Sequence, residues 1–228
     1  MVPHVPGRKR PGEPGSDDGL VHAIEHNVSS GDVMHGSPLL PSVVSTLMGH
    51  DIGAWRAGVG LSAVIRAAAD RAGWRADVQD GVAMGFAAST DAGTPCAQVA
   101  EVGIEEGRIR VHKVTCAIDP GIAVNPDLVR QQCEGSIVMG LSGAVFEAMT
   151  VQDGVLSPTL YGPYRMALMR DAPREIEVEI LQNTETPGPV GEPPLGSIGA
   201  AIANAVWRLT GERLRDMPLQ SALDRALA

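Results

Sequence analysis

A ten-residue stretch from Pro187 to Gly196 constrains this chain most, because it carries four prolines and three glycines around one carboxylate, Glu192. Proline fixes φ and has no N–H, whereas glycine lets the backbone pass close to another surface. Ser197 is typical of a helix N-cap and Gly211 of a helix end, and between them apolar residues recur at helical spacing: Ile198, Ile202, Val206 and Leu209. We expect a rigid loop with Glu192 beside a helix N-terminus, whose dipole favours the charged carboxylate. The alternative is an ordinary surface loop with a solvated glutamate.

The residues before this loop predict hairpins and separate helices. Apolar residues at helical spacing predict a helix over residues 61–72, with Gly73 at its exit. Two hairpins are predicted, one over residues 97–104 and 108–118 and one over residues 146–151 and 155–161, and a strand is predicted over residues 175–181. Because these elements show no regular βαβ alternation, the predicted fold class is α+β, with hairpins, a mixed sheet and packed helices.

A second helix is predicted to begin at Asn125, with Pro126 in its first position, and to run to about residue 144. Small and polar residues lie three or four positions apart on one side of it, namely Gln132, Ser136, Gly140 and Gly143. Each glycine in a helix interior costs roughly 0.5–1 kcal/mol relative to alanine, so these glycines require a reason. Close packing against another helix is one reason. A bulky ligand lying along the helix, bound by the amide of Gln132, is the other.

Composition excludes several classes of function. The 228 residues carry a net charge of −9, which argues against nucleic acid as a partner. No apolar run approaches the roughly 20 residues of a membrane span, and no apolar segment follows the basic residues 8–10, so no export signal is evident and a cytoplasmic location is expected. The three cysteines lack C-x-x-C spacing and are expected to be buried thiols of a reducing compartment.

Residues 1–18 are rich in Pro, Gly and charge, which predicts a flexible tail.

Other patterns carry less information. Residues 58–63 fit G-x-G-x-x-A and Asp80 follows about 20 residues later, but no convincing strand precedes them, as a dinucleotide site requires. A metal site would draw on the histidines of the same poorly patterned region, namely His22, His26, His35 and His50. The sequence contains neither a G-x-S-x-G elbow nor a P-loop, so serine hydrolase and nucleotide triphosphatase activities have no support.

Four segments, in this order, carry a resemblance to a known family: residues 98–102 (Gln-Val-Ala-Glu-Val), 116–126 (Cys-Ala-Ile-Asp-Pro-Gly-Ile-Ala-Val-Asn-Pro), 132–136 (Gln-Cys-Glu-Gly-Ser) and 190–194 (Val-Gly-Glu-Pro-Pro). Together they resemble the C-terminal part of the large subunit of the xanthine dehydrogenase and aldehyde oxidase family of molybdenum hydroxylases, especially the beta subunits of isoquinoline 1-oxidoreductases. The resemblance covers residues 61–219, so residues 61–228 are interpreted as a molybdopterin-binding-like domain and residues 19–60 as a partial upstream segment.

The resemblance implies a specific chemistry. In such enzymes a glutamate of the Gly-Glu-Pro loop takes a proton from a hydroxyl on molybdenum, which is held by molybdopterin, and the oxygen hydroxylates an N-heterocycle or an aldehyde. Glu192 matches this base, and Gly191 precedes it in the loop. Gln132 matches a glutamine that contacts the cofactor, and Gly135 and Ser136 lie where the helix approaches the pterin. The resemblance assigns no metal ligand to this chain, and it places the [2Fe-2S] clusters on a separate small subunit.

This chain departs from the family in length, because family large subunits are several hundred residues longer and their N-terminal half supplies many cofactor contacts. The expected partners are therefore an iron–sulfur small subunit and a chain that supplies the missing half. The alternative is a non-catalytic remnant, or an assembly module, of the same fold. Tyr161, Tyr164 and Arg165 are candidates for the wall of a substrate pocket, with ordinary packing as the alternative.

Overall fold

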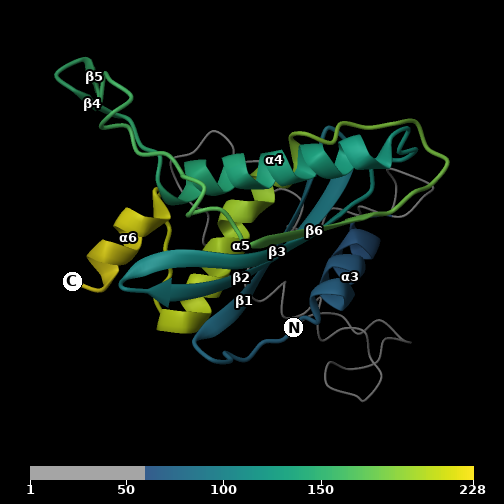
Figure 1. The fold of residues 1–228 in the computed structure, drawn as a ribbon, viewed down its shortest axis with the longest axis horizontal. Coiled ribbons are helices and arrows are strands. Elements are labelled where there is room, and N and C mark those ends of the chain that lie inside the picture. Colours follow the sequence, from purple (N-terminus) through teal and green to yellow (C-terminus); the bar gives the residue numbers. More distant parts are fainter. Residues whose placement is uncertain (1–59) are drawn as a thin grey trace, which may run out of the picture.

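A computed structural model describes residues 60–228 of the chain, and they form one four-stranded sheet packed between helices (Figure 1). The elements in chain order are α3 (Leu61–Ala72), β1 (Val82–Asp91), β2 (Thr94–Glu105), β3 (Arg108–Ile118), α4 (Pro126–Val145), β4 (Thr150–Gln152), β5 (Val155–Ser157), β6 (Glu175–Ile180), α5 (Pro193–Thr210) and α6 (Leu219–Ala226). The predicted α+β class is confirmed. The part of the chain that the structure describes holds no helix that is long and apolar enough to cross a membrane.

The sheet has the strand order β1-β2-β3-β6. Strands β1, β2 and β3 are antiparallel, whereas β6 runs parallel to β3 because α4 and the segment after it carry the chain back across the sheet. All three hairpins, β4–β5 included, turn through two residues with positive φ: Ala92-Gly93, Glu106-Gly107 and Asp153-Gly154. Such turns match the right-handed twist of the strands they join, so these short sequences fix the strand register.

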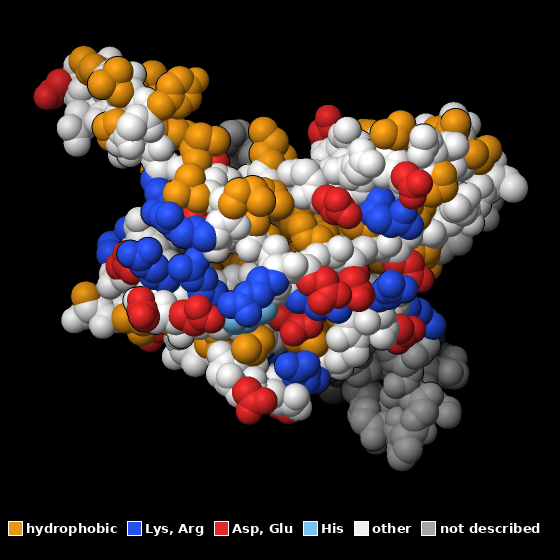
Figure 2. Space-filling model, viewed as in Figure 1, with side chains coloured by type: hydrophobic (Ala, Val, Ile, Leu, Met, Phe, Trp, Pro, Cys, Tyr) orange, Lys and Arg blue, Asp and Glu red, His pale blue; other side chains and the backbone are white. Residues whose placement is uncertain are grey.

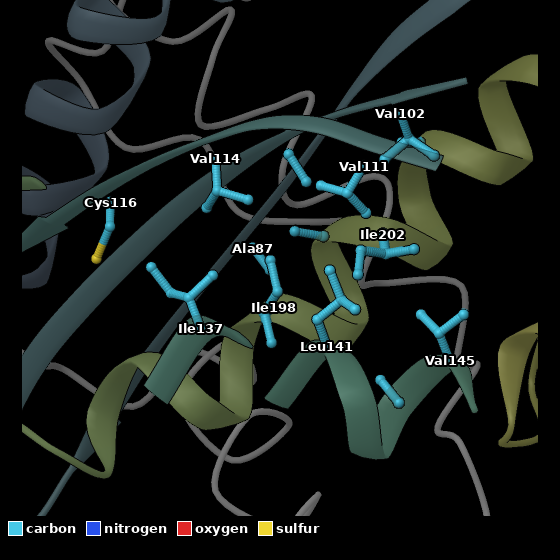
Figure 3. Close-up of a cluster of buried hydrophobic side chains, with 14 of the residues drawn as sticks. Ala87, Val102, Val111, Val114, Cys116, Ile137, Leu141, Val145, Ile198 and Ile202 are labelled. Carbon is cyan, nitrogen blue, oxygen red and sulfur yellow. The ribbon is translucent and has the colours of Figure 1, made fainter. Parts of the chain in front are cut away.

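The two faces of the sheet are covered by different helices. Helix α3 packs on one face against alternate residues of the three long strands, including Met84, Phe86 and Val99. Helices α4, α5 and α6 pack on the opposite face and form the larger core, part of which is shown in Figure 3. This core is aliphatic, as the low aromatic content requires, and Ile137, Leu141, Ile198 and Ile202 are almost fully buried in it.

Gly85 shows how closely α5 approaches the sheet. A Cβ built at this position in β1 would overlap the carbonyl oxygen of Ala201 and the backbone nitrogen of Ala205. No other residue fits there, because even alanine would push the helix backbone away from the strand. This contact fixes the position of α5, and therefore of the loop that leads into it.

Two of the predicted elements differ from the structure, and two were missed. Ser197 is not an N-cap: α5 begins at Pro193 and Glu192 occupies the N-cap position. The second hairpin is shorter than predicted, with strands of three residues each. Strand β1 and helix α6 were not predicted. The predicted helix after Asn125 is confirmed, since its side chain accepts a hydrogen bond from the Leu128 N–H at 3.1 Å.

Between α4 and β6 the chain forms an extended arm, residues 149–169, whose β4–β5 tip projects from the body of the molecule (Figure 1). Many of its apolar side chains are exposed, and Figure 2 shows them as a patch at the end of the projection. The exposed apolar residues of the arm are Met149, Val151, Val155, Leu156, Leu160, Tyr161, Met166, Leu168 and Met169.

Candidate functional site

The fold brings Gln132 of α4 to the loop that carries Glu192. Gln132 projects from the exposed side of the helix, and a Cβ built at Gly191 would lie 3.2 Å from its amide oxygen Oε1. This distance is shorter than most Cβ contacts, so glycine at 191 lets the loop approach the amide closely. Two sequence-predicted site residues that are far apart in the chain therefore meet, one residue away from the candidate base.

Hydrogen bonds to neighbouring elements hold the backbone of this loop. The Cys133 thiol donates to the carbonyl of Val190 over 3.9 Å, and the Gly188 N–H donates to the carbonyl of Pro120 at 2.8 Å. The Leu195 N–H closes the first turn of α5 on the carbonyl of Glu192 at 2.9 Å. The predicted rigidity of the loop thus has a structural basis in contacts on both sides of Glu192.

The turn after β3 supports the start of the same connection. Asp119 is fully buried, and its Oδ1 accepts the Asn183 side-chain amide at 2.7 Å and the Gly121 N–H at 3.2 Å. Gly121 has a φ of +74°, and a Cβ there would meet the carbonyl oxygens of Glu185 and Thr186 at less than 3 Å. The turn and the connection from β6 to α5 are therefore packed backbone against backbone.

Glu192 itself is exposed, and its carboxylate is not used to cap α5. Pro193 and Pro194 occupy the first two positions of the helix, where their missing N–H groups leave no donor unsatisfied. The Glu192 carboxylate lies beside the N-terminus of α5. The site therefore presents an exposed carboxylate on a backbone that is held in place.

The small residues of α4, in the predicted stripe and at Gly135, differ in what surrounds them. Gly140 faces α5: a Cβ there would lie 2.6 Å from Ile198 Cγ2 and 2.7 Å from the Leu195 carbonyl oxygen, so close helix packing explains this glycine. Within residues 60–228, no atom outside the helix's own backbone and the chain neighbours lies within 4 Å of a Cβ added at Gly135 or Gly143, so packing explains neither glycine. Ser136 is buried, and its hydroxyl has no hydrogen-bond partner among the described residues.

The candidate pocket-wall residues lie at the other end of α4. The Tyr164 hydroxyl donates to Glu147 at 2.7 Å, and Arg165 stacks over the Phe146 ring at 4.5 Å. Residue 146 is about 20 Å from Gln132 at the rise of an α-helix. These two residues therefore pack the arm onto the helix end and do not line the site, while Tyr161 is 88% exposed.

Sequence reasoning missed two residues beneath the loop. Gln98 of β2 donates through Nε2 to the carbonyl of Pro194, and the Ser89 hydroxyl of β1 donates to the carbonyl of Pro193 at 3.5 Å. Both side chains are buried. The signal in the sequence is a polar side chain next to a run of apolar residues in each strand, because such a side chain needs a partner when it is buried.

The cysteines and the weaker motifs offer no competing centre. Burial and hydrogen bonding to Cys133 and Cys96 hold the pKa of the Cys116 thiol well above its usual range, the bonds to the two cysteines being the larger cause, so it stays protonated. Gly60 of the G-x-G-x-x-A pattern is the N-cap of α3, and the four candidate histidines lie outside the described residues. Within residues 60–228, no group of three or more His, Cys, Asp or Glu is placed to hold a metal ion.

Comparison with known proteins gives this geometry a context. A family model described as a molybdopterin cofactor-binding domain matches residues 49–173, or 125 of the 228 residues, which include Gln132 and end before Glu192. The chain is 36% identical to isoquinoline 1-oxidoreductase subunit beta of Brevundimonas diminuta, over 71% of this chain and 21% of that protein. It is 32% identical to a membrane-bound aldehyde dehydrogenase [pyrroloquinoline-quinone] of Gluconacetobacter polyoxogenes, over 71% of this chain and 22% of that protein.

The fold is also found in a solved structure. Quinoline 2-oxidoreductase from Pseudomonas putida 86 superposes with a TM-score of 0.50 at 24% identity, over 59% of this chain and 18% of that one. This likeness concerns the fold alone. The chain spans about a fifth of the length of the curated relatives given above.

Proposed function

This chain belongs to the molybdopterin cofactor-binding domain family, within the xanthine dehydrogenase and aldehyde oxidase group of molybdenum oxidoreductases, and we propose that it supplies the catalytic base of a molybdenum hydroxylase. Glu192 is this base, and the substrate is an N-heterocycle or an aldehyde. The observation that carries the proposal is the contact between Gln132 and Gly191, which puts the candidate cofactor-binding amide beside the candidate base.

The residues at this place fit a molybdopterin. Gln132 presents an exposed amide that can both donate and accept hydrogen bonds, and Ser136 has a buried hydroxyl without a partner. Gly135 leaves open space beside them, so a flat, polar group can lie against the backbone of α4. When bound, the cofactor would supply a metal centre that lowers the pKa of a bound hydroxyl and accepts electrons.

The role of Glu192 follows from its surroundings. A general base must be able to reach the proton that it takes, and the carboxylate of Glu192 is exposed at the N-terminus of α5. It must also be held in one place, and the hydrogen bonds at Val190 and Leu195 hold the backbone on either side of it. In this role a carboxylate oxygen of Glu192 takes the proton, and Gln132 orients the bound group beside it.

The remaining parts of the site lie on further polypeptide. The part of this chain that matches these relatives covers only 21–22% of their length, and Gln132 and Glu192 are both exposed here. We infer that the rest of a large subunit covers this face, excludes water and supplies the other cofactor contacts. An iron–sulfur small subunit accepts the electrons.

The experiment is to co-express the chain with candidate polypeptides that carry the rest of a large subunit and an iron–sulfur protein, and to measure bound molybdenum, pterin and hydroxylase activity. Glu192→Gln should abolish turnover and leave the molybdenum content unchanged, because the amide cannot take a proton. Glu185→Gln, in the same connection but away from the Gln132 contact, is the matched control and should stay active. Normal turnover by Glu192→Gln would refute the assignment of the base.

The second candidate is a non-catalytic assembly or binding module of the same fold. The observation that favours it is coverage, since the chain spans about a fifth of its relatives. It would be supported if the assembled protein carries no molybdenum with any candidate partner. One relative is named as a pyrroloquinoline-quinone enzyme, so the same samples should also be assayed for pyrroloquinoline quinone.

A further inference from the structure

The segment from Val190 to Pro194 has few N–H groups with which to hold itself, because two of its five residues are proline. Its stability in one conformation therefore depends on what its carbonyl groups accept. Three side chains from the core donate to them: the Cys133 thiol to Val190, the Ser89 hydroxyl to Pro193 and the Gln98 amide to Pro194.

Of these three donors, only Gln98 donates through a side-chain amide N–H; the other two are a thiol and a hydroxyl. It lies in the middle of β2, it is 0% exposed, and its Nε2 also contacts the Cys96 sulfur at 3.9 Å. Its position in the sheet is fixed on both sides by pairing with Ala87 of β1 and Cys116 of β3. The donor therefore lies on a strand that is paired on both sides, and it reaches the first turn of α5.

The oxygen of the same amide, Gln98 Oε1, is unfavourable for the stability of the fold. Gln98 Oε1 is buried and finds no hydrogen-bond partner in the part of the chain that the structure describes. Burying an unpaired amide oxygen costs free energy, and an apolar residue of the same size in a sheet core avoids that cost. The Nε2 bond to Pro194 is therefore the contribution that an apolar residue could not make.

We propose that Gln98 is a positioning residue that fixes the direction of Glu192 through the first turn of α5. This inference rests on the proposed role of Glu192 as the base. The amide holds the Pro194 carbonyl from the sheet side, Ser89 holds the adjacent carbonyl, and Glu192 directly precedes both prolines. Loss of the amide leaves the helix folded but allows its first turn, and the carboxylate with it, to move.

The test uses Gln98→Met in the full 228-residue chain. Methionine keeps the length and approximate volume of glutamine and removes the donor. Amide hydrogen exchange at the four non-proline positions from 191 to 196 should become about tenfold faster, while exchange in the core strand β3 stays unchanged. If Gln98→Met does not fold, Gln98→Asn, which keeps the polarity but is one methylene too short, replaces it.

Ser142→Ala is the matched control. Its hydroxyl accepts a hydrogen bond from the Ala167 N–H at 2.9 Å, so this variant also removes one buried side-chain bond to backbone, at the far end of α4. It should leave exchange at positions 191–196 unchanged. Equal exchange at these positions in Gln98→Met and the unsubstituted chain would overturn the proposal, whatever the chain's activity.

In the active assembly the same variant separates positioning from simple stability. Gln98→Met should lower kcat about tenfold or more, with KM and molybdenum content unchanged, because a misplaced base affects the proton transfer and not the binding of substrate. Faster exchange together with full activity in Gln98→Met would show that Gln98 orders the loop but does not position the base. Normal turnover by Glu192→Gln would instead refute the proposed function, and the exchange measurement would still decide whether Gln98 orders the first turn of α5.

Discussion

The two ends of α4 meet the rest of the molecule in different ways. At the first end, Gln132 and Cys133 contact a loop that side chains from two strands also hold, so that few of its atoms can move independently. At the second end, the arm leaves the body and its tip, β4–β5, exposes every one of its six strand residues to solvent (Figure 2). At the first end the loop backbone is held by contacts within residues 60–228, whereas at the second end the strand residues of the tip are exposed.

The difference shows which part of the chain is held by contacts within residues 60–228. The backbone of the candidate site forms from contacts inside residues 60–228, so the position of Glu192 does not depend on a partner. The arm buries nothing at its tip, and a two-stranded hairpin alone is marginally stable in water. Its apolar side chains are the kind of surface that further polypeptide covers.

Gly140→Ala should have the largest effect on stability. The added methyl would lie 2.6 Å from Ile198 Cγ2 and 2.7 Å from the Leu195 carbonyl, and backbone cannot move aside cheaply. We expect a loss of about 3 kcal/mol in the free energy of unfolding. Gly143→Ala, in the same helix, meets no atom within 4 Å and should instead gain about 0.5–1 kcal/mol. Urea denaturation measures the free energy of unfolding of both variants. Equal effects of the two substitutions would contradict the close contact of Gly140 with α5.

The contrast also explains which parts of the fold could be predicted. Local chemistry predicted the Asn125 cap, the Asp153-Gly154 turn and the helix end at Gly211, because each depends on its own few residues. The start of α5 was misplaced because Pro193 and Pro194 were interpreted as loop, although prolines are tolerated in the first turn of a helix.

Tertiary contacts account for the rest. Strand β1 has no alternation of polar and apolar residues, since seven of its residues in succession are buried on the two faces of the sheet. Gly85 within it exists because α5 passes over it, which no local pattern records. The meeting of Gln132 with the Glu192 loop was expected from the family resemblance alone, and the role of Gln98 became visible only in the hydrogen bonds.

Asp171→Asn should have an intermediate effect, at the base of the arm. The carboxylate is 3% exposed and pairs with Arg110 at 3.1 Å and Arg165 at 3.2 Å. Both arginines are partly exposed, which screens the pairs, so we expect a loss of about 1–2 kcal/mol at pH 7. Asp127→Asn removes an exposed pair with Arg130 and should change stability by less than about 0.5 kcal/mol.

The pH dependence gives this prediction its sign. Burial alone would raise the pKa of Asp171, but the Leu168 N–H and the two arginines outweigh it and lower the pKa below the ordinary value of 3.8. The stabilisation is therefore fully present above pH 3.8 and is lost as the pH falls through the lowered pKa. In denaturation curves measured below that pH, the difference in the free energy of unfolding between Asp171→Asn and the unsubstituted chain should become smaller. A deficit that is constant with pH would show that the charge of Asp171 does not stabilise the arm.

The smallest effect is expected at the arm's tip, from the double variant Val151→Thr, Leu156→Thr. The two residues are directly paired across β4 and β5 and are 67% and 53% exposed, and threonine keeps the preference for a strand. Because neither side chain packs on the body, the free energy of unfolding should change by less than about 0.5 kcal/mol. Self-association, measured by sedimentation velocity, should decrease, since the apolar patch is smaller. A loss of stability above 1 kcal/mol would mean that the tip packs against the folded body, and the contrast between the two ends of α4 would then disappear.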